Sequence, residues 1–317
     1  MHLSADRTFF TFFTLIMNRK GSVCLSYREF LYQIEAQVKD RMGKEAQICI
    51  HSVVKNNSIV LDGLSILEQG DNVSPAIYLN GFYQEYLAGE TIEKIVSRIL
   101  AFYQRGRKIR KMDISFYTDP EKARKRVVCR VINQEKNHQL LREIPWRPFL
   151  NLAVVYYYLL EQEELGAASI LIRKEHLQMW GMEEEELHKT AVHNMKILQP
   201  YQFLSMTEMI YSMTGSEEIL RERIPLYVLT NRERYYGAVW MTDPAVLWEI
   251  GERLGQDYYV LPSSIHECMV VPAQIQPGEE ILKEMVREIN ATQVEPEEVL
   301  EDTIYYYNRE KEMIQLV

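Results

Sequence analysis

The sequence of 317 residues is poor in cysteine and has no long apolar run. Four scattered cysteines are too few for a disulfide scaffold, and no two of them form a C-x-x-C pair. That spacing argues against a zinc knuckle or a redox dithiol, and it fits a chain kept reduced in the cytoplasm. No apolar stretch reaches the roughly 18 residues needed to cross a bilayer, so we expect no membrane association.

Motifs of several common enzyme classes are also missing. No glycine-rich turn follows a strand in a βαβ pattern, which argues against a dinucleotide-binding fold. No G-x-S-x-G sequence marks a nucleophile elbow, and no strong cofactor or metal motif is present, so we expect neither a cofactor nor a metal. What is present is an ordinary globular composition, with 47% apolar residues and a formal charge of −9. This length allows one large domain or two smaller ones.

The first residues form an unusual segment. An apolar patch at residues 9–17 is followed at once by Asn18-Arg19-Lys20, where a signal peptide would need small residues for cleavage. We therefore expect residues 1–16 to be a disordered or artefactual extension, with Met17 as the functional start. The alternative is an apolar strand that packs on the body of the protein.

The next part of the chain, residues 22–110, predicts an N-terminal module with a helix and a small antiparallel sheet. A capping-box sequence from Ser26 to Glu29 opens an apolar pattern with helical spacing, and Gly43 ends it. Two β-rich stretches around a polar turn predict a hairpin, and a proline-led stretch predicts a third strand. These three stretches are residues 46–54, 58–67 and 75–79.

Residues 111–317 predict a larger module with a mainly antiparallel sheet and helices packed on it, so the fold class is α+β. Asp119-Pro120 predicts the start of a helix, and the apolar residues that follow would share one face of that helix. These residues are Ala123, Val127, Val128, Val131 and Ile132. Two hairpins are predicted near the C-terminal end, at residues 226–230 with 236–241 and at residues 303–307 with 313–317.

Several stretches resemble a bacterial family known as domain of unknown function 5688. The stretches are Leu61-Asp62-Gly63-Leu64, Ser74-Pro75-Ala76-Ile77-Tyr78-Leu79, Val131-Ile132-Asn133-Gln134-Glu135-Lys136-Asn137, Trp180-Gly181-Met182-Glu183-Glu184-Glu185-Glu186-Leu187, Leu261-Pro262-Ser263-Ser264-Ile265-His266-Glu267 and Tyr305-Tyr306-Tyr307-Asn308-Arg309-Glu310. The likeness spans roughly residues 26–310. It implies a bacterial source, but no activity, fold or active site.

The corner at residues 263–267 holds the weak catalytic candidates Ser264, His266 and Glu267. In an extended chain Ser264 and His266 share one face, which suggests a hydrolase. Working triads, however, assemble from distant segments. The alternative is a corner between two strands, where serine hydroxyls satisfy backbone groups.

Positive charge is concentrated in residues 105–130, which hold ten basic and three acidic residues, a local net of +7. Such a patch on an acidic chain can bind a polyanion or an acidic partner weakly. Alternatively, it is a solvated helix face that pairs with the acidic run Glu183 to Glu186. The candidate binding residues are Arg105, Arg107, Lys108, Arg110, Lys111, Arg124, Lys125, Arg126 and Arg130.

A dense polar run follows the basic segment. Asn133 and Asn137 lie four apart, hence on one face of the expected helix, and could line a groove or cap the helix end.

Two functional hypotheses follow. The first is a non-enzymatic, cytoplasmic binding or regulatory protein that engages a macromolecular partner. The second is a hydrolase or nucleotide-handling enzyme that uses the 263–267 corner. An enzyme should show a partly exposed His266 with a distant carboxylate converging on it, whereas a binding module should show His266 packed.

Overall fold

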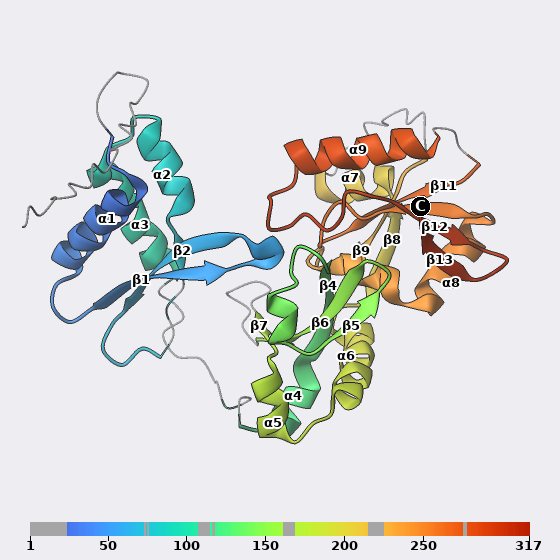
Figure 1. Ribbon diagram of the computed structural model, residues 1–317, viewed down its shortest axis with the longest axis horizontal. Coiled ribbons are helices and arrows are strands. Elements are labelled where there is room, and N and C mark those ends of the chain that lie inside the picture. The colour runs from blue at the N-terminus through green and yellow to red at the C-terminus, as the bar shows by residue number, and fades with distance from the viewer. Residues whose placement is uncertain are drawn as a thin grey trace, which may run out of the picture. The chain divides into compact units, whose positions relative to one another are not determined.

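The computed structural model describes residues 24–72, 74, 76–106, 115, 118–160, 169–214, 225–274 and 278–317 (Figure 1). The predicted extension at residues 1–16 lies outside these residues. The chain divides into two compact units. The first unit consists of Met1–Val54 and Val60–Met112, and the second of Lys55–Ile59 and Asp113–Val317. The α+β fold class, with a small sheet module followed by larger antiparallel sheets, is confirmed.

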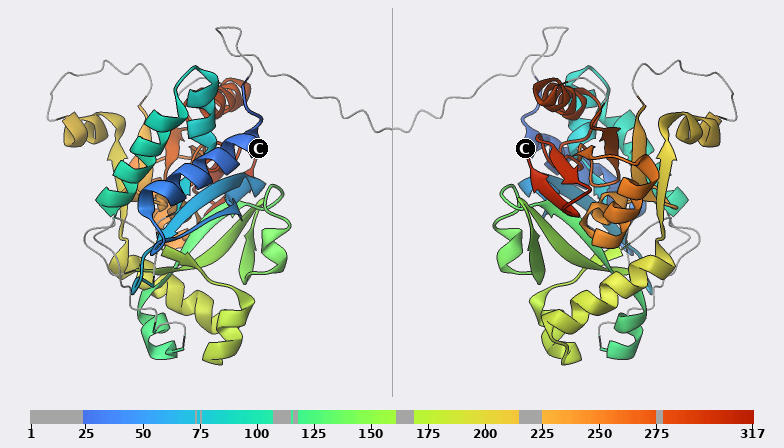
Figure 2. Two further views of the ribbon diagram at one scale, coloured as in Figure 1. Left: turned by 90° about the vertical axis from the view of Figure 1, so that its left-hand side faces the viewer. Right: turned by 90° about the vertical axis from the view of Figure 1, so that its right-hand side faces the viewer.

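The first unit packs three helices on one three-stranded antiparallel sheet. Its elements are α1 (Tyr27–Met42), β1 (Gln47–Val54), β2 (Val60–Leu67), β3 (Ile77–Tyr78), α2 (Asn80–Leu87) and α3 (Ile92–Gly106), with strand order β1-β2-β3. The capping box forms as predicted, because Ser26 and Glu29 satisfy each other's backbone N–H groups. Figure 2 shows α1 and α3 side by side on the β1–β2 sheet. Their apolar faces bury Phe30, Ile34 and Ile99 completely.

The second unit contains a four-stranded sheet flanked by helices. Its elements are α4 (Pro120–Arg126), β4 (Val127–Asn133), β5 (Trp146–Phe149), β6 (Leu152–Leu159), β7 (Ser169–Leu171), α5 (Lys174–Trp180) and α6 (Glu184–Leu198). A short 3-10 helix, η3 (Leu140–Arg142), precedes β5. β6 pairs with β4, β5 and β7, always antiparallel.

The helix predicted from Asp119 to beyond Ile132 is wrong in its second half. Asp119 does cap α4, through its side chain and the N–H groups of Glu121 and Lys122. The helix ends at Arg126, however, and the chain continues as β4, in which all seven residues are buried. β-branched residues favour a strand, and in a strand buried on both faces an apolar run resembles a helical stripe.

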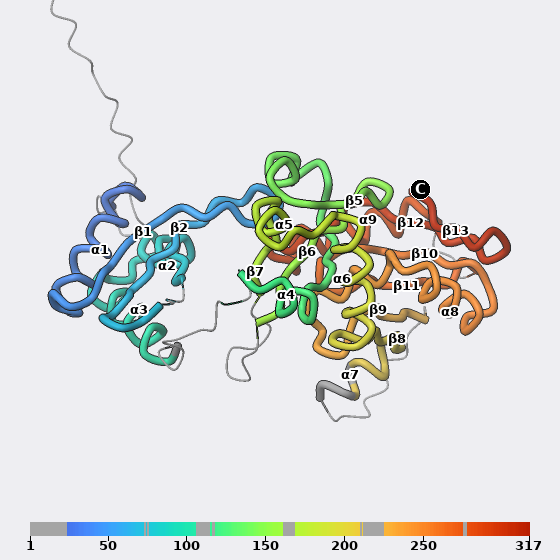
Figure 3. The backbone as a smooth tube through the Cα atoms, turned by 90° about the horizontal axis from the view of Figure 1, so that it is seen from below, coloured from blue at the N-terminus to red at the C-terminus, as the bar shows by residue number. Residues whose placement is uncertain are grey.

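The remainder of the second unit is a six-stranded antiparallel sheet with order β13-β12-β10-β11-β9-β8. Its elements are β8 (Tyr201–Ser205), α7 (Met206–Thr214), β9 (Tyr227–Asn231), η4 (Gly237–Thr242), α8 (Pro244–Leu254), β10 (Tyr258–Leu261), β11 (Cys268–Pro272), α9 (Glu279–Thr292), β12 (Tyr305–Asn308) and β13 (Met313–Leu316). β10, β11, β12 and β13 lie side by side in Figure 3. The predicted C-terminal hairpin is confirmed.

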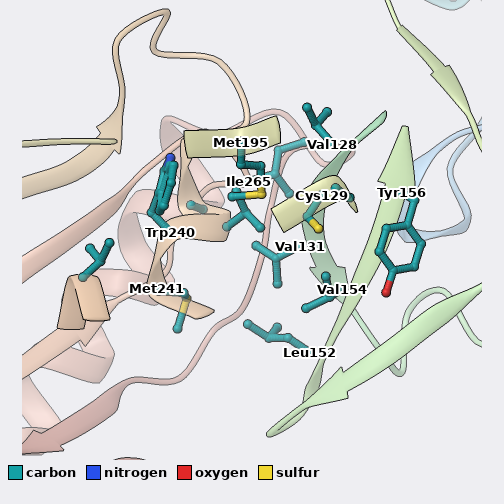
Figure 4. Packing of buried hydrophobic residues seen from close by; sticks show 14 of the residues in the cluster. Val128, Cys129, Val131, Leu152, Val154, Tyr156, Met195, Trp240, Met241 and Ile265 are labelled. Atoms are coloured by element: carbon teal, nitrogen blue, oxygen red, sulfur yellow. The ribbon is translucent and has the colours of Figure 1, made fainter. Parts of the chain in front are cut away.

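The predicted strand at residues 236–241 is instead the 3-10 helix η4. Tyr236 has a φ of 60°, a left-handed conformation that turns the chain out of an extended path. Figure 4 shows what the turn achieves: Trp240 and Met241 face Val131, Leu152 and other apolar side chains of the four-stranded sheet. η4 therefore joins the two sheets of the second unit into one core.

Candidate functional site

The 263–267 corner links β10 to β11 and is held by backbone hydrogen bonds on two sides. Ile265 N–H donates to the Glu298 carbonyl at 2.9 Å, and Leu300 N–H donates to the Ser263 carbonyl at 3.1 Å. On the other side, Gly237 N–H donates to the His266 carbonyl at 2.8 Å. The Ser264 hydroxyl accepts from the backbone N–H of His266 at 3.1 Å. Ser264 therefore stabilises the turn.

His266 packs against two aromatic rings that also contact each other, and 17% of its side chain stays exposed. Its ring centroid lies 4.9 Å from that of Tyr235 and 5.0 Å from that of Tyr236. The backbone N–H of Tyr236 donates to Nδ1 at 3.1 Å, so Nδ1 acts as an acceptor there and the ring proton sits on Nε2. Nε2 lies 3.2 Å from the Glu298 carboxylate. A distant carboxylate does converge on His266, but both ring nitrogens are already engaged.

This geometry does not support Ser264 and His266 as a nucleophile and its base. A base must have a ring nitrogen free to accept the serine proton, and His266 offers none in this arrangement. The Ser264 hydroxyl accepts from the backbone N–H of His266, and within the described part of the chain it makes no hydrogen bond to the ring. The corner therefore has the contacts expected of a turn between two strands, in which a serine hydroxyl satisfies a backbone group.

Glu267, the third member of the corner, is a half-buried carboxyl. Burial raises its pKa, and the electrostatic effects of the neighbouring His266 and Arg234 side chains lower it by less. The folded state therefore holds a proton on Glu267 more tightly than the unfolded chain does.

Replacing Glu267 by glutamine is expected to raise Tm near pH 7 and to leave it unchanged near pH 3. An unfolded glutamate titrates at about 4.3. Because the folded-state pKa is higher, the ionised carboxylate costs stability as the pH rises through that folded-state pKa, and the neutral amide removes this cost. Thermal unfolding at both pH values measures the effect, with the exposed Glu310→Gln as control. An equal change in Tm at both pH values would contradict the explanation.

Arg130 lies next to this corner, in the interior of the protein. Its side chain leaves β4 on the face opposite Cys129 and Val131 and is 3% exposed. The guanidinium carbon lies 3.3 Å from the ring centroid of Tyr236 and 3.9 Å from that of Tyr157. One terminal nitrogen donates to the Ser169 hydroxyl at 2.5 Å, whereas Nε has no hydrogen-bond partner among the residues that the structure describes. Burial lowers the pKa of this guanidinium.

The structure thus brings together two sets of residues that the sequence kept apart. Tyr236 touches both Arg130 from the basic list and His266 from the corner. We name this group the tyrosine cluster: Tyr157, Tyr235, Tyr236, Arg130 and His266. The tyrosine runs 156–158 and 235–236 are visible in the sequence, but the sequence does not show that they meet Arg130 and His266.

The other basic candidates are divided between the two units. Arg105 is exposed at the end of α3 in the first unit, with its guanidinium carbon 5.8 Å from the Phe102 ring centroid. Arg107, Lys108, Arg110 and Lys111 lie outside the described residues.

In the second unit, Arg124 pairs with Glu121 at 2.7 Å and with Glu186 at 2.9 Å, as the alternative interpretation expected. Arg126 donates to the Leu159 carbonyl, and Lys125 is exposed. The ion pairs of Arg124 reduce the free positive charge here. Weak polyanion binding stays a prediction.

Asn133 and Asn137 are buried, 4% and 1% exposed, and are not on a helix. Asn133 ends β4 and donates to the Glu301 carboxylate at 2.9 Å. Asn137 receives the backbone N–H of Asn57 at 2.9 Å and donates to the Asn56 side chain at 2.9 Å. Residues Lys55–Ile59 connect β1 to β2, and we call this turn the tip. The side chain of Asn57 anchors the tip by donating to the carbonyls of Pro296 and Val299. Both amides hold the interior of the second unit together.

The first unit contains an open hollow of about 460 Å³ between β3, α2 and α3. Its lining is mostly apolar and consists of Ala76, Ile77, Tyr78, Gly81, Phe82, Glu85, Arg98 and Phe102. Phe102 is 51% exposed and meets the buried Phe82 edge to face, with 6.3 Å between ring centroids. Arg98 packs its guanidinium 5.3 Å above Phe82 and forms a two-bond ion pair with Glu85. Phe102 follows the buried Ile95 and Ile99 at helical spacing, yet it stays exposed.

Fold and site together define a two-unit α+β protein with an apolar hollow in its small unit and a histidine at the 263–267 corner whose two ring nitrogens both have partners. The chain belongs to a family of unknown function (DUF5688), which matches residues 27–309. No curated protein and no solved structure matches the chain.

Two further observations concern metals and membranes. Among the described residues, no three His, Cys, Asp or Glu side chains gather where they could hold a metal ion. In the same part of the chain, every helix is too short or too polar to span a bilayer.

Proposed function

We propose that this chain is a binding protein that engages a polypeptide partner through the hollow of the first unit. The observation that carries the proposal is Phe102, a large apolar side chain that stays 51% exposed beside a hollow of about 460 Å³. Exposed aromatic side chains next to apolar pockets are typical anchors of protein interfaces.

The charges around the hollow favour an acidic partner. Arg98 is already neutralised by Glu85, but Arg105 makes no ion pair within the described residues and lies against the Phe102 ring. A partner that inserts an apolar side chain would therefore gain most from a carboxylate next to it. β3 is an edge strand of the sheet, so an extended segment can approach the hollow alongside Ile77 and Tyr78.

The proposed location is the reducing cytoplasm. None of the four cysteines forms a disulfide, and burial raises the pKa of the thiols of Cys129 and Cys268. Thiols of this kind behave as small apolar side chains, which supports a chain that folds without disulfides.

Selection of a random-peptide phage library on the full chain tests the proposed function. We expect enriched peptides that combine one large apolar residue with acidic neighbours. The dissociation constant of a synthetic version should rise at least tenfold for Phe102→Ala, because the anchor loses its contact surface. Arg105→Glu should weaken binding as well, and more at low salt than at high salt.

Tyr32→Ala is the matched control, since Tyr32 is 70% exposed in the same unit but does not line the hollow. This variant should bind the peptide like the wild type. The proposal fails if no peptide is enriched, or if the enriched peptides bind Phe102→Ala as tightly as the wild type.

A further inference from the structure

A second hollow, of about 420 Å³, lies in the second unit around the polar run that follows β4. Its lining residues are Gln134, Glu135, His138, Leu141, Arg142, Trp146 and Asn151. These residues come from the turn after β4, from η3, from β5 and from the connection between β5 and β6. β5 and β6 are paired strands and lie side by side in Figure 1. A groove lined by Asn133 and Asn137 was one of two alternatives for this run, and the hollow is instead lined by their neighbours Gln134, Glu135 and His138.

One side of this hollow is apolar and fixed. Leu141 is 5% exposed and packs with Ile144 and Val155 in a small core beneath the sheet, and the half-buried Trp146 packs against the same core. The wall at Asn151 is equally fixed, because its side chain donates to the Glu301 carboxylate at 2.6 Å and accepts from the Tyr305 hydroxyl at 2.5 Å. The hollow is therefore preformed.

The other side presents polar groups that the protein does not use. Within the described residues, the side chains of Gln134, Glu135 and Arg142 make no hydrogen bond or ion pair, and neither does the indole N–H of Trp146. His138 uses only Nδ1, which lies 3.2 Å from the Glu135 carbonyl. Amide, carboxylate, guanidinium, imidazole and indole groups thus face one space with both donors and acceptors.

We propose that this hollow binds a carbohydrate ring. A sugar ring has a C–H face that packs on an indole, and hydroxyls that donate and accept at once, so it can match every free group. A phosphate would meet the like charge of Glu135 beside Arg142. A free amino acid would engage Arg142 and Glu135 and leave the amide of Gln134 unmatched. This site lies wholly in the second unit and does not depend on the proposed function.

Saturation-transfer NMR on the full chain tests this site. The probes are methyl glycosides of glucose, galactose, mannose and N-acetylglucosamine, with a free amino acid mixture and inorganic phosphate in separate arms. At least one glycoside should show transfer to its ring protons, with millimolar or tighter affinity. Trp146→Ala should weaken that affinity at least tenfold, because the stacking face is lost.

Two variants separate loss of the site from loss of the fold. Glu135→Ala changes an exposed side chain and should also weaken binding, whereas Trp248→Ala removes a 47% exposed indole outside the hollow and should not. The proposal is overturned if no glycoside binds, if binding persists in Trp146→Ala and Glu135→Ala, or if only amino acids or phosphate bind.

Discussion

Replacing Gly237 by alanine is expected to lower the free energy of unfolding by about 3 kcal/mol, because no side chain fits at this position. An added Cβ would lie 2.3 Å from the backbone nitrogen of Asn231 and 2.5 Å from the Thr230 hydroxyl oxygen. Thr230 and Asn231 are 0% and 1% exposed, and the Thr230 hydroxyl donates to the His266 carbonyl at 2.9 Å. None of these atoms can move without breaking the link between β9 and the 263–267 corner.

Urea unfolding of Gly237→Ala and of a control, Gly81→Ala, measures this effect. An added Cβ at Gly81 meets no atom within 4 Å, and the residue lies in α2, so alanine there should be neutral or stabilise by up to about 1 kcal/mol. If both variants unfold at the same urea concentration as the wild type, the close approach at Gly237 is not required.

The second large effect is expected at Arg130, where alanine and methionine should behave differently. Arg130→Ala should cost about 3 kcal/mol, because it leaves a cavity between the rings of Tyr157 and Tyr236. Arg130→Met should stay within about 1 kcal/mol of the wild type. Methionine fills much of the same space and loses the cation–π contacts. It also removes a buried charge, and among the described residues no carboxylate lies within ion-pair distance of that charge.

The comparison of the two Arg130 variants by urea unfolding distinguishes packing from charge. A methionine variant as unstable as the alanine variant would show that the guanidinium itself holds the tyrosine cluster together. Tyr211→Ala, a 53% exposed tyrosine in the same unit, should change the free energy of unfolding by less than about 0.5 kcal/mol.

Local signals predicted the helices and strands whose ends are marked by capping or turn residues. The capping box at Ser26, the positive-φ Gly43 that ends α1 and the N-cap Asp119 all lie where the sequence predicts them. The wrong predictions of secondary structure occur in short apolar runs without such residues. Val127–Asn133 and Gly237–Thr242 are buried on several sides, so alternation cannot separate strand, helix and 3-10 helix.

The candidate sites were less accessible from the sequence than the fold. The polar run at Gln134 and Glu135 was recognisable, but Trp146 and Arg142 reach the hollow only through the pairing of β5 with β6. Arg130 was predicted to belong to the exposed basic patch, because composition cannot show on which face of a strand a residue lies. Its tyrosine partners are 27 and 106 positions away in the sequence.

The tip Lys55–Ile59 has a consequence for how the chain is made. Its bonds to Pro296, Glu297 and Val299 join residues 239 to 242 positions apart. On a ribosome that adds about 5–20 residues per second, the tip therefore waits on the order of 10–50 s for its partners. Asn56, Asn57 and Ser58 are all polar, so water can satisfy this turn until the last part of the chain emerges.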